Sequence, residues 1–255
     1  MSENPVLTSG DRGVSVITLN RPEKRNALND ELIAGLKNAL EEAANDPDTY
    51  VILLKGSGKD FCSGADLESL ERIAAASIEE NLADARLLAD LFIKIRKIDK
   101  PVIAAVHGRA LAGGCGLASS CDLVVAAKSA IFGYPEIKIG FVPAIVMAFL
   151  RRSVPEKITF ELTTRGRQFT AEEGFNYGLV NRVFDDETFP SDSFEYAADY
   201  SKFSRSAVKM TKRLLYDIDY NDLNSAIEKG IEVNARARMT EDCKSGIRRF
   251  LEKRF

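Results

Sequence analysis

The sequence predicts an α/β fold on three observations. Short runs of β-branched and apolar residues alternate with helical patterns through about residue 140. The rest of the chain is mostly helical in pattern. With 255 residues, 45% hydrophobic and 29% charged, the chain has an ordinary globular composition and enough length to bury a large core.

The elements predicted for the core follow one another in short segments. Residues 28–44 carry leucines at helical spacing, and a second helical stretch covers about 82–98. The glycine-rich segment 108–116 is interpreted as a turn. Short apolar runs that end at turn residues predict strands at 14–19, 50–54, 102–106 and 123–127.

The last part of the chain is predicted to be a helical appendage. Helical patterns cover 204–216 and 220–255, and no segment rich in Pro, Gly and Ser separates them from the rest. We therefore divide the chain into an α/β core at 1–195 and a C-terminal helical region at 196–255. This region either packs on the core or provides a surface for other subunits.

Composition and patterning argue against several classes of partner. A net charge of -3 gives no electrostatic reason to expect nucleic acid, and the apolar runs are too short to cross a membrane. The four cysteines have no metal-ligand spacing and the chain has one histidine, so no metal site is predicted. Because the first residues lack the layout of a signal peptide, we expect a cytoplasmic protein with reduced thiols.

Three segments carry residues suited to chemistry: 59–67, 106–118 and 132–136. In the first two, glycines follow predicted strands, where backbone amides can approach a ligand without a Cβ in the way. Amides at a helix start are unpaired and lie in positive potential. Two such amides from separate loops could stabilise one oxygen as it gains negative charge, and losing one donor typically costs about 3–4 kcal/mol in catalysis. Neither a dinucleotide-binding motif nor a P-loop occurs.

The order of several motifs resembles the crotonase (enoyl-CoA hydratase/isomerase) family over most of the chain. The motifs are Asn-Arg-Pro at 20–22, Asn-Ala-Leu at 26–28, Phe-Cys-Ser-Gly-Ala-Asp-Leu at 61–67, Gly-Gly-Cys-Gly-Leu-Ala at 113–118, Phe-Gly-Tyr-Pro-Glu at 132–136, Gly-Arg at 166–167 and Phe-Leu-Glu-Lys-Arg at 250–254. The resemblance implies a crotonase-like spiral of ββα units with a C-terminal helical trimerisation region.

The resemblance also implies how the site works. An acyl-CoA thioester would lie across the first two loops, with its carbonyl oxygen bound by the amides of Ala65 and Gly113 and with Glu136 as acid/base. No cofactor is implied beyond the coenzyme A of the substrate, and a homotrimer or homohexamer is expected. Arg25 and Lys59 are equally well explained as solvated surface charges. The positions placed at the substrate are Arg25, Ala27, Leu28, Lys59, Ser63, Ala65, Asp66, Leu67, Gly113, Gly114, Phe250 and Lys253.

One departure from the family pattern affects which reactions the site can catalyse. The family's hydratases carry two carboxylates, and the position of the first falls on Gly116, which has no titratable group. Glu68, Glu71 or Asp66 could replace the missing acid. The segment 144–148 is also bulkier and more apolar than in relatives with two Glu, so it either shapes the acyl pocket or forms helix core.

With one carboxylate, the slightly favoured function is isomerisation of a 3-enoyl-CoA to the conjugated 2-enoyl-CoA. One base can remove a proton from C2 and return it at C4, and partial desolvation of Glu136 beside Pro135 and Ile137 would raise its pKa toward that task. The first alternative is hydration of a 2-enoyl-CoA with a second acid from elsewhere. The second alternative is a non-catalytic acyl-CoA binding protein.

Overall fold

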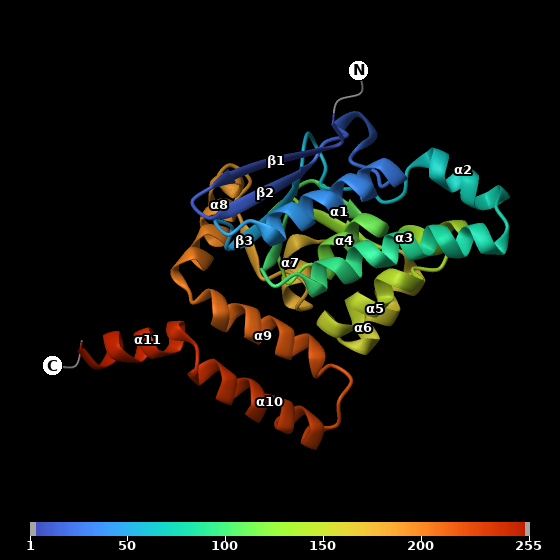
Figure 1. Cartoon of the computed structure of the whole chain (residues 1–255). Helices are drawn as coiled ribbons and strands as arrows, with labels where there is room; N and C mark the ends of the chain where they lie inside the picture. Colours follow the sequence, from blue (N-terminus) through green and yellow to red (C-terminus); the bar gives the residue numbers. More distant parts are fainter. Residues whose placement is uncertain (1–3, 253–255) are drawn as a thin grey trace.

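The chain folds around a mostly parallel β-sheet (Figure 1). The computed structural model describes residues 4–252, apart from the side chain of Leu67. The strands of the main sheet are β1 (Val6–Asp11), β2 (Val14–Leu19), β3 (Val51–Gly56), β4 (Val102–Val106), β6 (Leu123–Ala127) and β9 (Arg182–Phe184). They lie in the order β1-β2-β3-β4-β6-β9, with β1 antiparallel to β2 and the others parallel to their neighbours.

A smaller sheet lies beside the main one and leads into the loops of interest. Its strands are β5 (Arg109–Leu111), β7 (Ile131–Gly133) and β8 (Gln168–Thr170). They lie in the order β5-β7-β8, with β5 parallel to β7 and β7 antiparallel to β8. Because β5 follows β4 and β7 follows β6, the chain steps repeatedly from the main sheet to the small one. The predicted α/β spiral of ββα units is confirmed.

Helices fill the connections between the strands. They are η1 (Pro22–Lys24), α1 (Asp30–Asn45), α2 (Leu67–Ala75), α3 (Ile78–Lys97), α4 (Gly113–Ser120), η2 (Pro135–Ile139), α5 (Ala144–Ser153), α6 (Glu156–Arg165), α7 (Ala171–Asn176) and α8 (Phe189–Ala198). Helix α1 packs on β1 and β2, and α3 packs against α1. Helix α1 buries Leu32, Leu36 and Leu40, one per turn, which is the leucine spacing that predicts it.

Two parts of the core differ from the sequence prediction. The segment 108–116, interpreted as a turn, contains β5 and the first turn of α4. The turn interpretation was wrong because the glycines at 113 and 114 open a helix. Helix α2 was not predicted. Asp66 caps it by accepting a hydrogen bond from the Glu68 amide.

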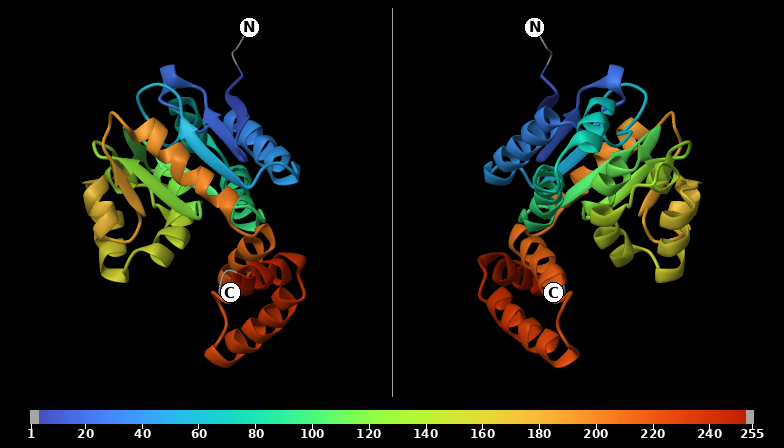
Figure 2. Two further views of the ribbon diagram at one scale, coloured as in Figure 1. Left: turned by 90° about the vertical axis from the view of Figure 1, so that its left-hand side faces the viewer. Right: turned by 90° about the vertical axis from the view of Figure 1, so that its right-hand side faces the viewer.

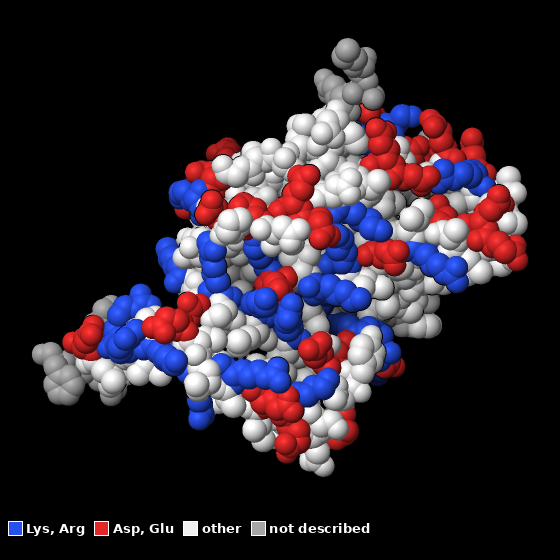
Figure 3. Space-filling view, in the orientation of Figure 1, with Lys and Arg blue, Asp and Glu red and all other residues white. Residues whose placement is uncertain are grey.

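The C-terminal helices stand apart from the α/β core in the side views of Figure 2. They are η3 (Asp199–Lys202), α9 (Arg205–Asp217), α10 (Leu223–Arg238) and α11 (Glu241–Glu252). The helical pattern at 220–255 is therefore divided, since α10 ends before α11 begins. In Figure 3 many Lys and Arg side chains gather around α9, which carries Arg205, Lys209, Lys212 and Arg213.

A buried ion pair attaches α9 to the core. The Lys212 ammonium donates to Asp122 (2.7 Å) and to the carbonyl oxygens of Ile95 and Lys100. Asp122 also accepts from the Tyr216 hydroxyl and from the backbone amide of the first residue of β4. Across residues 4–252, no helix is both long enough and apolar enough to span a bilayer.

Candidate active site

A cavity of about 670 Å³ brings the predicted catalytic groups together. Ala65, Gly113 and Glu136 all line it. Its walls come from α1, the loop before α2, α2, α3, the start of α4, η2 and the start of α5. Its apolar lining includes Leu28, Ile33, Leu70, Ile73, Leu87, Leu88, Ile139, Phe141, Val142, Ile145 and Val146.

The Ala65 amide is turned away from residue 28 by a short parallel bridge between the two residues. The Leu28 amide donates to the Gly64 carbonyl (2.7 Å), and the Asp66 amide donates to the Leu28 carbonyl (3.1 Å). In a parallel bridge the residue between these two bonds directs its own N–H to the other side. Within residues 4–252, the Ala65 amide has no protein acceptor.

The Gly113 amide is the first N–H of α4, and it also lacks an acceptor in the described part of the chain. It follows Ala112, which holds a positive φ of 49° that is rare for a residue with a Cβ. The Ala112 amide donates to the Gly133 carbonyl (2.8 Å), and its carbonyl accepts from Gly116 (2.9 Å), so this conformation is fixed from both sides.

The loops that carry the two amides touch each other. Gly64 has a φ of 98°, and a Cβ built on it would lie 2.9 Å from Ala112 Cβ and 3.6 Å from the Gly113 nitrogen. Only glycine lets the Ala65 loop approach the start of α4 so closely. The geometry is therefore suited to two amides acting on one ligand oxygen.

Glu136 projects from η2, the turn that Pro135 opens and that Gly140 ends in a left-handed conformation. One carboxyl oxygen, Oε2, is buried and has no hydrogen-bond partner among the described residues. Burial raises the pKa of Glu136, opposed by a hydrogen bond from its own backbone amide. A carboxylate with a raised pKa and an uncommitted oxygen is suited to reversible proton transfer.

The acids considered as replacements do not line this cavity. Asp66 is 4% exposed, pairs with Arg21 (2.9 Å) and caps α2. Burial raises its pKa, but the Arg21 contact and the Glu68 amide lower it further, so it stays below the usual value. Glu68 is exposed and reaches Lys24 (3.5 Å), and Glu71 is exposed on α2. The structure therefore gives Asp66 the role of bracing the loop.

Two other acids do line the cavity, and sequence reasoning missed both. Asp30 opens α1 and Asp84 lies on α3. Both are bound by Arg72 of α2, which donates to Asp30 (2.9 and 3.0 Å) and to Asp84 (3.2 Å). Both acids thus share one cation at the cavity wall.

Asn26 organises the loop predicted to contact coenzyme A. It is fully buried with a φ of 55°, and its side chain accepts from the Arg21 amide and donates to the Ser57 and Asp60 carbonyls. Ala27 is buried behind it, whereas Leu28 lines the cavity. Asn tolerates the left-handed conformation, which is the signal that sequence reasoning could have used.

The remaining predicted binding residues are dispersed. Ser63 lines the cavity. Arg25 is exposed, with its side chain 3.9 Å from Asp60. Lys59 lines a second cavity, between α8 and the main sheet. Gly114 does not line the active-site cavity, since a Cβ there would lie 2.2 Å from the Cys62 carbonyl oxygen.

The last predicted binding positions are Leu67, Phe250 and Lys253. Leu67 begins α2, but its side chain is outside the described residues. Phe250 is 58% exposed on α11, away from the cavity lining. Lys253 lies outside the described residues.

The segment 144–148 serves both of the roles considered for it. It forms the first half of α5, in which Val146 and Leu150 are buried. Ala144, Ile145 and Val146 also line the cavity. This stretch is therefore helix core on one side and cavity wall on the other.

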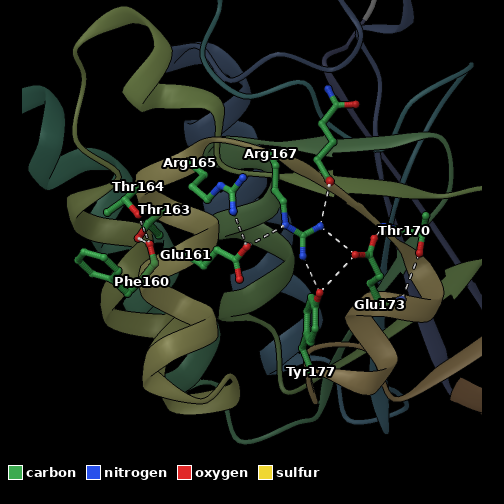
Figure 4. Close-up of polar contacts among 10 residues, drawn as sticks. Phe160, Glu161, Thr163, Thr164, Arg165, Arg167, Thr170, Glu173 and Tyr177 are labelled. Carbon is green, nitrogen blue, oxygen red and sulfur yellow. Dashed lines mark hydrogen bonds and ion pairs between the residues drawn. The ribbon is translucent and has the colours of Figure 1, made fainter.

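Figure 4 shows a cluster of polar contacts around Arg167, and one of the helices in it, α6, packs on η2. Arg167 donates to Glu173 (2.8 Å) and to the Tyr177 hydroxyl (2.6 Å), and lies 3.9 Å from Glu161. These contacts join α6, β8 and α7, and α6 packs on η2. A Cβ built on Gly166 would lie 2.9 Å from Ile137 of η2, which shows how closely this corner approaches the turn carrying Glu136.

Three of the four cysteines are core residues, and Cys243 on α11 is partly exposed. Cys62 and Cys115 are buried and free, and burial raises the pKa of each thiol to about 12. A neutral thiol is a poor nucleophile. Across residues 4–252, no group of three or more His, Cys, Asp or Glu side chains is arranged to hold a metal ion.

Comparison with known proteins identifies the family and the fold. A family model described as Enoyl-CoA hydratase/isomerase matches residues 9–255. The chain belongs to the enoyl-CoA hydratase/isomerase family. This enzyme is 35% identical to the 2,3-dehydroadipyl-CoA hydratase of Escherichia coli, over 100% of this chain and 97% of that relative. It is 32% identical to the short-chain-enoyl-CoA hydratase of Clostridium acetobutylicum, again over 100% and 97% of the two chains.

The solved structures agree with the sequence relatives. The crystal structure of an enoyl-CoA hydratase from Mycobacterium smegmatis superposes with a TM-score of 0.94 at 34% identity. The match covers 98% of this chain and 97% of that one. The crotonase-family resemblance inferred from the motifs is thereby confirmed for the whole described fold.

Proposed function

We propose that this enzyme isomerises a 3-enoyl-CoA to the conjugated 2-enoyl-CoA through a thioester enolate. The amides of Ala65 and Gly113 bind the thioester oxygen as it gains charge, and Glu136 takes a proton from C2 and returns it at C4. The coenzyme A is part of the substrate, and no further cofactor takes part.

The observation that carries this proposal is the state of the three acids that line the cavity. Asp30 and Asp84 are both held by Arg72, and Glu136 keeps a buried oxygen without a partner in the described residues. Isomerisation needs one base, because the same group removes and returns the proton. Hydration must in addition hold and activate a water molecule, and no second carboxylate among the described lining residues has a buried oxygen without a partner.

Hydration of a 2-enoyl-CoA remains the second candidate, and a specific observation favours it. The two relatives named above are both called hydratases, and one of them acts on 2,3-dehydroadipyl-CoA by its name. A water held by the Ser63 hydroxyl or by a backbone group of the cavity would then replace the missing acid.

A pair of substrates tests the proposal. With a 3-enoyl-CoA, isomerisation creates the absorbance of the conjugated thioester, whereas hydration of a 2-enoyl-CoA removes it. We expect the unmodified enzyme to create this absorbance faster than it removes it. Binding of both thioesters without turnover of either would instead support a non-catalytic acyl-CoA binder.

We also propose a homotrimer or homohexamer in the cytoplasm, with acyl-CoA as its ligand and neither nucleic acid nor membrane as a partner. Exposed apolar side chains on the C-terminal helices support the assembly, among them Leu223, Ile227, Ile231 and Ile247. Burying such side chains between subunits contributes favourable free energy. Light scattering during size-exclusion chromatography measures the assembly, and a monomeric mass would contradict it.

A further inference from the structure

Gly116 and Val146 meet where α4 packs on α5. A Cβ built on Gly116 would lie 2.2 Å from Val146 Cγ1 and 3.0 Å from its Cβ, and 3.2 Å from Phe92 Cε2. Non-bonded carbons do not approach to 2.2 Å, so Val146 fills the volume into which any side chain at position 116 would project. Val146 is 4% exposed and lines the same cavity as Glu136.

The cavity wall that Val146 belongs to is made of hydrocarbon. From α4 and α5, the cavity is lined by Gly113, Ala144, Ile145 and Val146, none of which has a polar side chain. The two serines of α4 are committed to their own helix, since the Ser119 hydroxyl donates to the Cys115 carbonyl and the Ser120 hydroxyl to the Leu117 carbonyl. A water needs two to four polar partners to be held in place, and these side chains supply none.

Resting on the proposed function, we propose that Val146 determines the outcome of the reaction by excluding water from this wall. When the C2–H bond breaks, the proton passes to the Glu136 carboxylate and the electron pair moves to the thioester oxygen. On return, the pair of the C3–C4 double bond forms the new C4–H bond, the C1–C2 pair of the enolate becomes the C2–C3 double bond, and the pair on the oxygen re-forms the thioester carbonyl. Atoms and electrons balance without water. Hydration would require a water oxygen to bond to C3 and a proton to bond to C2.

Isotope retention tests this role directly. The substrate is a 3-enoyl-CoA deuterated at both C2 positions, and the product is analysed for deuterium at C4. We expect the unmodified enzyme to carry part of the label to C4. Val146→Ala opens the wall, so we expect several-fold more loss of label to solvent and the appearance of 3-hydroxyacyl-CoA from a 2-enoyl-CoA.

Val154→Ala is the matched control for this experiment. Val154 is 2% exposed at the end of the same helix but does not line the cavity. It loses the same two methyl groups from the core, so a general loosening of α5 would affect both variants alike. Equal label retention in Val146→Ala and Val154→Ala, with no hydrated product from either, would overturn the inference.

A stability measurement checks the underlying contact without any turnover. Gly116→Ala overpacks the α4–α5 contact, so we expect its Tm to fall by about 4–10 °C. In the Val146→Ala background most of that fall should disappear. Gly230→Ala in α10, where no heavy atom lies within 4 Å of the added Cβ, should instead raise Tm slightly. Additive effects of Gly116→Ala and Val146→Ala would show that the two residues do not compete for space.

Different experimental results would contradict the role of Val146 and the proposed function. Rapid hydration of a 2-enoyl-CoA by the unmodified enzyme would overturn the exclusion of water by Val146 and leave enolate stabilisation intact. Absence of double-bond migration with every 3-enoyl-CoA tried would overturn the proposed function, and the role of Val146 with it.

Discussion

Glu136→Gln separates proton transfer from binding more sharply than any other change in this cavity. Gln keeps the size of the side chain and removes its ability to accept a proton. Positioned acid–base groups contribute about 10²–10⁴-fold to rate, so we expect kcat to fall by that factor. Binding of a saturated acyl-CoA should stay the same, because the cavity keeps its shape and the amides of Ala65 and Gly113 are untouched.

The pH dependence gives a second, independent signature of Glu136. Burial raises the pKa of this carboxyl above its value in an unfolded chain. Because catalysis needs the carboxylate, kcat should rise with pH through that raised pKa, and this acidic limb should vanish in the residual activity of the Glu136→Gln variant.

The raised pKa of Glu136 should also make the stability of the fold depend on pH, in a direction that follows from the sign of the shift. The folded state binds the Glu136 proton more tightly than the unfolded state, so ionisation destabilises the fold as pH rises from the unfolded pKa through the folded pKa. Below both values the carboxyl is neutral in either state and costs nothing. Glu136→Gln should therefore match or exceed the parent in Tm at neutral pH, and the difference should vanish in acid.

Steady-state kinetics with a 3-enoyl-CoA from about pH 5 to about pH 9, together with calorimetric binding of the saturated thioester, measure these effects. Glu71→Gln is the control, because Glu71 is exposed on α2 and outside the cavity lining. A Glu136→Gln variant that retained most of the parental kcat, with its acidic limb intact, would refute the assignment of the base.

Two further changes test the scaffold of the site. Lys212→Met leaves Asp122 buried without its cation, so we expect a loss of about 3–5 kcal/mol in thermal unfolding. Lys209→Met on the same helix breaks a half-exposed pair and should cost about 0–1 kcal/mol, and equal losses would contradict the reasoning. Gly64→Ala places a methyl group 2.9 Å from Ala112 Cβ, which should move the two amides apart and lower kcat by about 10²-fold. Unchanged kinetics in a normally folded Gly64→Ala variant would show that this loop contact does not position the amides.

The sequence predicted the strands well wherever burial is continuous. Val102–Val106 is apolar at every position, all five residues are buried, and the predicted bounds match the structure. The bounds of Val14–Leu19 and Leu123–Ala127 also match, and most of their residues are buried. A strand that is buried on both faces is a nearly continuous apolar run, so the run itself indicates where the strand begins and ends.

The site was predicted less completely because its decisive contacts are distant in sequence. Asp66 meets Arg21 from 45 residues away, and nothing near Asp66 indicates this partner. Arg72 of α2 binds acids from two other helices, whereas Glu71 beside it faces solvent. Which of two neighbouring charged residues reaches the acids of other helices depends on the angle at which the helix packs. Local spacing does not contain that information.

The glycines near the cavity explain why a family motif can identify the site although the motif itself does not reveal the three-dimensional contacts. Gly114 lies where a Cβ would meet the Cys62 carbonyl oxygen, and Gly116 lies where it would meet Val146. Both are therefore contacts between packed elements, although in the sequence they read as part of a turn. Gly114 lets the start of α4 reach the loop before Ala65. Gly116 instead lets an apolar side chain of α5 stand beside the cavity. Within this three-residue stretch, the first glycine sets how closely two loops approach, and the second sets which side chain of α5 fits beside the cavity.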